Sequence, residues 1–199
     1  CGNYTLVLAS TPVNFSITAR PITVKATSIS RIYGDSTPAF AIELASGSLA
    51  SGDTLAGLGT PVFGTDPAPA VNVGTYKINV SGLSNSNYNI GYASGEARGT
   101  LTITARPITV TADAKSKTYG DADPTLTYQV TSGSLVNGDS FSGALTRVAG
   151  ENVGTYAIQQ GTLALSSNYN LTYVGANLTI AARPITVTAD AKSKTYGDA

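Results

Sequence analysis

The sequence lacks histidine, methionine and tryptophan and has a single cysteine, Cys1, so several classes of chemistry lose their usual side chains. One cysteine cannot form a disulfide within the chain. Without histidine, zinc and the heavier transition metals lose common ligands, and acid–base catalysis near neutral pH loses its most frequent side chain. We therefore assign no catalytic, cofactor-binding or metal-binding residue and expect no cofactor.

Charge is also sparse. Twelve Lys and Arg residues balance 12 Asp and Glu residues, which gives a net charge of zero. No basic patch is present to neutralise phosphates, and no apolar run approaches the length that crosses a bilayer. We expect no nucleic-acid partner and no membrane insertion by this segment.

Repetition is what the chain has in abundance. The string Ala-Arg-Pro-Ile-Thr-Val begins at Ala19, Ala105 and Ala182, and Tyr-Gly-Asp begins 13 residues after each arginine. Further motifs recur in the same order: Ser-Gly-Ser-Leu at 46–49 and 132–135, Gly-Asp at 52–53 and 138–139, Val-Gly-Thr-Tyr at 73–76 and 153–156, Asn-Tyr-Asn at 87–89 and 168–170, and Leu-Thr-Ile at 101–103 and 178–180. A period of this size predicts a tandem array of domains.

The repeat predicts four segments. These are the end of a preceding repeat (1–18), two complete repeat modules (19–104 and 105–181) and the beginning of a following repeat (182–199). Because the chain begins with cysteine and contains no methionine, we interpret it as an excerpt of a longer protein. Length differences between the two copies cluster between the shared motifs, which is typical of surface loops.

Strand patterns dominate both copies, as short runs rich in Val, Ile, Thr and Tyr that alternate with polar residues. Strands are expected at 22–26, 40–44, 75–80, 88–92 and 100–104, and at 108–112, 126–130, 155–158, 169–173 and 177–180. With roughly six or seven strands per module, we expect an all-β fold, either an Ig-like sandwich or β-grasp-like. The one helical candidate is a single turn at 49–53 and at 135–139.

The join between the two copies is short. The last motif of the first copy ends at Ile103 and the apolar pattern of the second begins at Ile108, which leaves Thr104 to Pro107 as the join. Pro107 fixes its own φ and favours an extended Arg106. We therefore expect small β modules arranged end to end with limited swivel.

Ten of the eleven tyrosines occupy repeated positions. Because every copy needs them, we expect buried rings with anchored hydroxyls, and we expect Tyr76 and Tyr156 in particular to be buried framework residues. Exposed tyrosines that bind sugars or partner proteins are the alternative. The repeated positions are 33/119/196, 76/156, 4/88/169 and 92/173.

Tyr-Gly-Asp is expected to form a turn after the first strand of a module, because glycine accepts positive φ and aspartate can close an Asx-turn. An integrin-like recognition role for the tripeptide is the alternative. Asp121 and Asp123 resemble the start of a calcium loop, but the first copy has Asp35 and Thr37 there and loses the second carboxylate. Turn chemistry is therefore preferred, as it is for Asp53 and Asp139.

Six motifs in this order carry a family resemblance: Ala-Arg-Pro-Ile-Thr-Val, Lys-Thr-Tyr-Gly-Asp, Leu-Val-Asn-Gly-Asp, Val-Gly-Thr-Tyr, Asn-Tyr-Asn-Leu-Thr-Tyr and Leu-Thr-Ile. The whole chain resembles the MBG/YDG-type repeats of large bacterial surface proteins, many of which are similar to filamentous-haemagglutinin-type adhesins exported by two-partner secretion. The resemblance implies an extracellular, cell-surface repeat and no particular ligand. The first copy departs from the pattern at 28–33 and has a longer loop at 58–73, which affects any shared binding surface.

We therefore expect a non-enzymatic structural repeat of a secreted bacterial adhesin. It would act as a semi-rigid stalk or spacer that presents a binding tip in cell adhesion or biofilm formation. Its partners would be the neighbouring repeats of the same chain. The alternatives are a module that binds a host or matrix glycan or protein by multivalency, and a spacer in a large extracellular enzyme.

Overall fold

The computed structural model describes residues 2–3, 7 and 14–199. The chain divides into two compact units, Cys1–Thr104 and Ala105–Ala199. Most of the segment that the sequence assigns to a preceding repeat, including Tyr4, lies outside the described residues.

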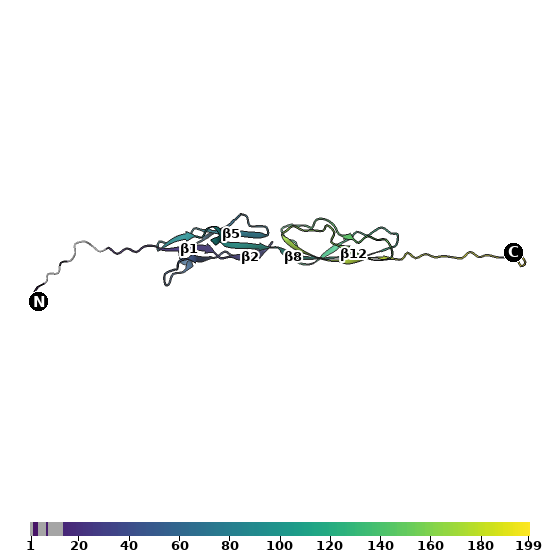
Figure 1. Cartoon of the computed structure of the whole chain (residues 1–199), viewed down its shortest axis with the longest axis horizontal. Coiled ribbons are helices and arrows are strands. Elements are labelled where there is room, and N and C mark those ends of the chain that lie inside the picture. The colour runs from purple at the N-terminus through teal and green to yellow at the C-terminus, as the bar shows by residue number, and fades with distance from the viewer. Residues whose placement is uncertain (1, 4–6, 8–13) are drawn as a thin grey trace. The chain divides into compact units, whose positions relative to one another are not determined.

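The described part of the first unit contains seven strands in two sheets, and β1 and β5 in Figure 1 belong to different sheets. One sheet has the order β3-β1-β6, in which β1 is antiparallel to β3 and parallel to β6. The other has the order β2-β7-β5-β4, in which β2 and β7 are parallel and the remaining neighbours are antiparallel. The strands are β1 (Arg20–Ala26), β2 (Ile29–Ile32), β3 (Ile42–Ser46), β4 (Val62–Asp66), β5 (Gly74–Ser81), β6 (Tyr88–Tyr92) and β7 (Gly99–Thr104).

The second unit repeats this topology strand for strand. Its sheets have the orders β10-β8-β13 and β11-β12-β14-β9, with the parallel pairs β8–β13 and β9–β14 in the matching places. The prediction that the two copies share one fold is confirmed. The strands are β8 (Arg106–Ala112), β9 (Lys115–Thr118), β10 (Tyr128–Ser132), β11 (Thr146–Arg147), β12 (Gly154–Gln159), β13 (Tyr169–Val174) and β14 (Ala176–Ala181).

Alternate side chains of both sheets form the core of each unit. In the second unit Val110 of β8, Ile158 of β12 and Leu178 of β14 pack together with Leu145 and Leu163 from loops. The first unit has the matching cluster, which is formed by Ile22, Val24, Leu58, Leu83 and Tyr88. Because strand side chains alternate between faces, each unit is a two-layer β-sandwich closed over one apolar layer.

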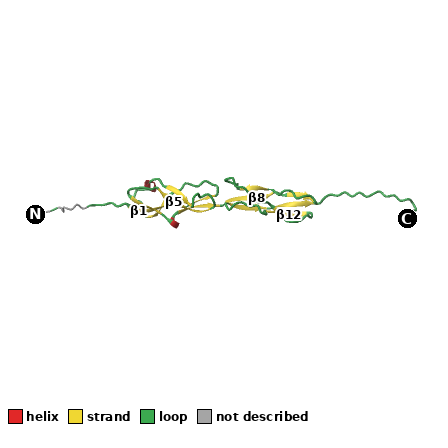
Figure 2. Cartoon of the chain, turned by 90° about the horizontal axis from the view of Figure 1, so that it is seen from above, coloured by secondary structure: helices red, strands yellow, loops and turns green. Residues whose placement is uncertain are grey.

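The all-β prediction is confirmed. Figure 2 shows strands and loops, with short 3-10 turns at Leu55–Leu58 and Gly95–Ala97 as the helical segments of the described residues. The β-grasp alternative is wrong for these units, because no α-helix covers a sheet in the described part of the chain. No helix among the described residues has the length and hydropathy of a membrane span.

Two pairs of strands were not expected from the sequence. The edge strands β2 and β9 lie at one end of the four-stranded sheets, and β4 and β11 lie at the other end. β9 reads Lys-Ser-Lys-Thr, so it is held by parallel hydrogen bonding to β14 instead of by an apolar face.

The helical turns expected at 49–53 and 135–139 are wrong. Both segments form turns, which are closed where the N–H of Asp53 donates to Ala50 O at 3.1 Å and the N–H of Asp139 donates to Val136 O at 3.0 Å.

The connection between the two copies is shorter than the sequence suggested. β7 ends at Thr104 and β8 begins at Arg106, so Ala105 alone separates the two strands. Arg106 and Pro107 are already part of β8, where they pair with Tyr169 and Asn170 of β13.

Candidate functional site

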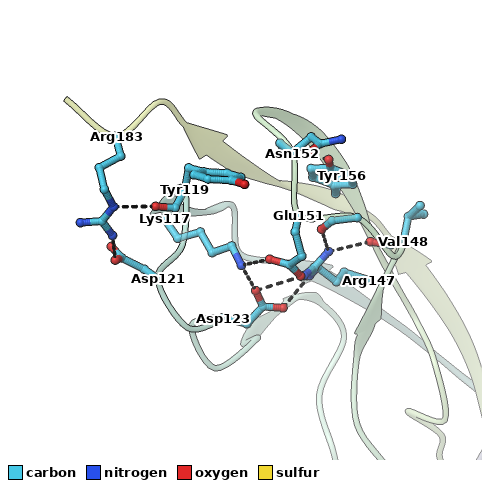
Figure 3. Close-up of polar contacts among 11 residues, drawn as sticks. Lys117, Tyr119, Asp121, Asp123, Arg147, Val148, Glu151, Asn152, Tyr156 and Arg183 are labelled. Carbon is cyan, nitrogen blue, oxygen red and sulfur yellow. Dashed lines mark hydrogen bonds and ion pairs between the residues drawn. The ribbon is translucent and has the colours of Figure 1, made fainter. Parts of the chain in front are cut away.

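The polar residues of the second unit gather around the turn that comes after β9, which is drawn in Figure 3. β9 and β14 run parallel, with Thr118 opposite Ala181, and the N–H of Tyr119 donates to Ala181 O at 2.8 Å. The chain continues from Ala181 through Ala182 to Arg183. This register places the Arg183 side chain beside the turn.

Arg183 contacts two residues of the Tyr119-Gly120-Asp121 turn. Its Nε donates to Tyr119 O at 2.8 Å, and its Nη2 forms an ion pair with Asp121 Oδ1 (Figure 3). A Cβ built on Gly120 would lie 3.8 Å from Nε and 3.9 Å from Nη2, so the guanidinium lies against the bare glycine. The side chains of Arg183 and Asp121 are 50% and 51% exposed.

The expected turn at Tyr-Gly-Asp is confirmed in both copies. The N–H of Asp121 donates to Thr118 O at 3.0 Å, and Gly120 has a φ of 85°. In the first copy the N–H of Asp35 donates to Ile32 O at 3.1 Å, and Gly34 has a φ of 84°. A turn with positive φ at its third residue favours glycine there. The turn comes after β2 or β9, the second strand of its module, and not after the first strand as expected.

A closed network of four charges lies beside this turn (Figure 3). Lys117 Nζ lies 2.6 Å from Asp123 Oδ1 and 2.6 Å from Glu151 Oε2. Arg147 Nε lies 2.5 Å from Asp123 Oδ2, and Arg147 Nη2 pairs with Glu151 Oε1. Each cation therefore contacts both anions, and the network joins β9, β11 and the two loops that extend from these strands.

The geometry keeps all four groups charged. The side chains of Lys117 and Arg147 are only 4% and 11% exposed. Hydrogen bonds from Arg147 and then Lys117 lower the pKa of Asp123 to about 2, and those from Lys117 and then Arg147 lower the pKa of Glu151. The pKa values of both cations are raised by their hydrogen bonds to Asp123 and Glu151.

Arg147 also holds the loop between β11 and β12. Its Nη1 donates to Val148 O at 3.0 Å and to Gly150 O at 2.6 Å. Its guanidinium carbon lies 5.6 Å from the centroid of the Tyr156 ring, which is cation–π geometry. The Tyr156 hydroxyl in turn donates to Asn152 O at 2.8 Å.

Tyr76 and Tyr156 are half-buried, so the prediction that they are buried framework residues is wrong. Tyr76 repeats the geometry of its counterpart, since its hydroxyl donates to Asn72 O at 2.8 Å. The hydroxyls bind carbonyls of the preceding surface loops, which keeps both rings at the border of the sandwich. Their contribution is to anchor those loops.

In the first copy, the loop between β4 and β5 corresponds to the loop between β11 and β12, and it is held by different contacts. Arg31 stands at the position of Lys117, while Thr37 replaces Asp123. Arg31 Nη2 donates to Ala70 O at 3.0 Å, and its Nη1 donates to Asp35 O at 3.0 Å. A cation on the edge strand β2 or β9 thus fixes the same loop in both copies.

Buried tyrosines form a second repeated arrangement. The Tyr88 hydroxyl donates to Asp53 Oδ2 at 2.5 Å and accepts from the N–H of Ala50 at 2.8 Å. The hydrogen bond to the Asp53 carboxylate is the main reason that the pKa of Tyr88 is raised. The second unit has the same arrangement, in which the Tyr169 hydroxyl donates to Asp139 Oδ2 at 2.9 Å. Asp53 and Asp139 lie in turns, as expected, and their carboxylates also accept a hydrogen bond from a tyrosine hydroxyl, which the sequence did not indicate.

The other tyrosines vary. Tyr33 is buried like Tyr88 and Tyr169, whereas Tyr92 and Tyr119 are 37% and 48% exposed. Tyr196, in the segment after β14, is fully exposed. Burial thus holds for only part of the repeated set.

The two carboxylates that suggested a calcium loop are engaged by cations, Asp121 by Arg183 and Asp123 by Lys117 and Arg147. Over the described residues, no group of three or more His, Cys, Asp and Glu side chains is arranged for a metal ion.

A hollow of about 530 Å³ lies at the start of the first copy, between residues 17–20 and Asp53, Asn87 and Tyr88. Two of its polar side chains already have partners. Arg20 Nη1 donates to Leu49 O at 3.3 Å, and Asp53 accepts from Tyr88. These two side chains are therefore already engaged within the first unit.

Comparison with protein families identifies both copies. The model of the MBG domain (YGX type) matches residues 22–102 and 108–179, which is most of the chain. No curated protein and no solved structure matches the sequence. The glycine-containing turn, the shared seven-strand topology and these two matches agree, and the chain belongs to the MBG-domain family of the YGX type, with two copies of the domain in tandem.

Proposed function

We propose that this chain is a non-enzymatic spacer of an extracellular bacterial surface protein, in which MBG domains in series hold a binding region away from the cell. Membership of the MBG-domain family supports a repeat module of a large surface protein. The spacer role rests on how each domain would carry a pulling force.

The strands that connect each domain to the rest of the chain lie inside its sheets. In the first domain, β1 lies between β3 and β6, and β7 lies between β2 and β5. In the second domain, β8 lies between β10 and β13, and β14 lies between β12 and β9. A force applied through the chain therefore has to shear backbone hydrogen bonds on both sides of the loaded strand. This placement is the observation that carries the proposal.

The polar residues also favour a structural role over catalysis. The repeated Asp53 and Asp139 accept tyrosine hydroxyls, and Asp123 binds two cations. A general acid needs a pKa near the working pH, whereas the pKa of Asp123 is about 2. These carboxylates hold loops and turns in place.

Single-molecule pulling on the 199-residue chain tests the load-bearing role. We expect two separate unfolding events, each releasing the length of one domain, because the central strands of each sandwich must be sheared. Gradual extension at low force without discrete events would contradict the proposal.

The single residue between β7 and β8 supports a restricted join, because a short connection limits the freedom of what it links. Arg106 and Pro107 pair within β8, so the sharper test inserts Gly-Ser-Gly-Ser after Ala105 and leaves the strand intact. Small-angle scattering should give a broader distribution of particle lengths for this insertion than for the wild type. The same insertion after Pro38, in an exposed loop of the first domain, is the matched control and should leave the distribution unchanged.

A glycan array probed with the same chain separates the spacer from a binding module. We expect no selective binding. Selective, saturable binding to one glycan class would replace the spacer role with the multivalent binding role.

A further inference from the structure

We propose that the Tyr119-Gly120-Asp121 turn is a docking site for the start of the next repeat, and that Arg183, the arginine of the next Ala-Arg-Pro sequence, is the residue that occupies it. The proposal goes beyond the spacer role, because it concerns this contact whether or not the protein carries load.

The parallel pairing of β9 and β14 places Arg183 next to the Tyr119-Gly120-Asp121 turn. Both strands run in the same direction and end side by side, with Ala181 opposite Thr118. The hydrogen bond from the N–H of Tyr119 to Ala181 O continues this pairing by one residue. The turn that follows β9 and the residues that follow β14 therefore lie side by side at the same edge of the sheet.

The turn matches an arginine in two ways. The carbonyl of Tyr119 accepts from Nε, and the carboxylate of Asp121 accepts from Nη2. Lysine carries one ammonium nitrogen on a flexible stem, so it lacks the two separate nitrogens with which the planar fork of Arg183 reaches the carbonyl and the carboxylate. The turn is therefore better matched to arginine than to lysine.

The neighbouring charge network does not include Asp121, which pairs with Arg183 instead. Asp123, two residues further along, already binds Lys117 and Arg147 through both of its oxygens. Arg147 pairs with Asp123 and Glu151, and Lys117 does the same. Asp121 is the carboxylate of this loop that binds Arg183 (Figure 3).

The residues after Arg183 identify the occupant. Residues 183–187 read Arg-Pro-Ile-Thr-Val, the same sequence that begins β8 in the second domain. Ile108 and Val110 of β8 are buried, whereas the matching Ile185 and Val187 are 82% and 85% exposed. The contact of Arg183 with the turn thus holds the chain immediately before residues whose sequence matches the first strand of a domain. The half-exposed ring of Tyr119 lies at the same turn.

Backbone dynamics of the 199-residue chain test the docking site by NMR. In the wild type, the heteronuclear NOE of Ala182 and Arg183 should approach the values of β14, and the Nε–H of Arg183 should exchange slowly with water. Arg183→Gln and Asp121→Asn should lower the NOE toward that of residues 190–198 and speed proton exchange several-fold. Arg183→Lys should behave like Arg183→Gln, because the fork is lost.

Asp190→Asn is the matched control, since Asp190 lies on the exposed tail with an 86% exposed side chain. It should change neither measurement, and the amide shifts of β12 should report an intact fold in every variant. A wild-type Arg183 as mobile as the tail, or values unchanged by both Asp121→Asn and Arg183→Gln, would overturn the docking site. Neither result bears on whether the domains resist force, so the two proposals fail separately.

Discussion

The Tyr169 hydroxyl shows how single side chains hold this domain together. It accepts from the N–H of Val136 at 2.9 Å and donates to the carboxylate of Asp139, while the ring is 7% exposed. One atom therefore satisfies a backbone donor and fixes a turn. Recurrence in the sequence predicted an anchored hydroxyl but not its partners, because Asp139 and Tyr169 are 30 residues apart.

Tyr169→Phe should lower the free energy of unfolding of the second domain by about 1–3 kcal/mol, because the part-buried N–H of Val136 loses its acceptor. Urea unfolding followed through NMR signals of each domain measures the effect. Tyr88→Phe is the matched change and should weaken the first domain in the same direction. A loss below about 0.5 kcal/mol for Tyr169→Phe would show that the hydroxyl is dispensable.

The stability of the second domain should depend on pH through Asp123. Its folded pKa of about 2 lies below the ordinary value of 3.8, so the ionised carboxylate stabilises the fold above about pH 4. This contribution is lost as the pH falls toward 2. Asp123→Asn should remove it, which thermal melts between pH 2 and pH 5 would show as a flatter profile.

The first domain serves as an internal reference for that measurement, because it has Thr37 where the second has Asp123. Its profile should be unaffected by Asp123→Asn. An equally steep profile for the wild type and the variant would mean that ionisation of Asp123 does not stabilise the second domain.

At the scale of elements, the first strand of each domain depends on a glycine next to a bulge. The pairing of β8 with β10 shifts register between Val130 and Ser132, and Gly133 comes next with a φ of 77°. A Cβ on Gly133 would lie 2.5 Å from Pro107 O. Close approach of two backbones thus allows the end of β10 to reach β8.

Gly133→Ala should destabilise the second domain by more than the roughly 1–2 kcal/mol that positive φ alone costs, because its Cβ also meets the Pro107 carbonyl. Gly138→Ala is the matched control, since Gly138 has the same φ of 77° but nothing within 4 Å of a Cβ. If urea unfolding gave the same loss of unfolding free energy for Gly133→Ala and Gly138→Ala, the contact of the new Cβ with the Pro107 carbonyl would cost nothing.

The edge strands of the four-stranded sheets are the elements that the apolar pattern of the sequence did not predict. The expected positions of β1, β5, β6 and β7 agree with the structure to within about two residues, a usual spread for strand ends. β9 has no apolar alternation because it lies at a sheet edge. Only its pairing with β14 makes it a strand.

For the whole molecule, removal of calcium should leave both domains unchanged. Asp121 and Asp123 are bound by arginine and lysine side chains, and the first domain lacks the second carboxylate. Thermal melts with and without EDTA should coincide for both domains. A drop of several degrees in either melting temperature would reveal a calcium site.

The sequence by itself determined the repeat, the all-β class and the turn at Tyr-Gly-Asp, because these depend on local patterns of apolar residues and glycine. The tertiary structure decided which residues meet. Asp121 reaches Arg183 across 62 residues because β9 and β14 pair in parallel, and Lys117 reaches Glu151 across 34 because β14 lies between β9 and β12 in the same sheet. The repeated tyrosines also look alike in the sequence. Their burial depends on whether the ring enters the layer between the sheets, as for Tyr169, or lies against a surface loop, as for Tyr156.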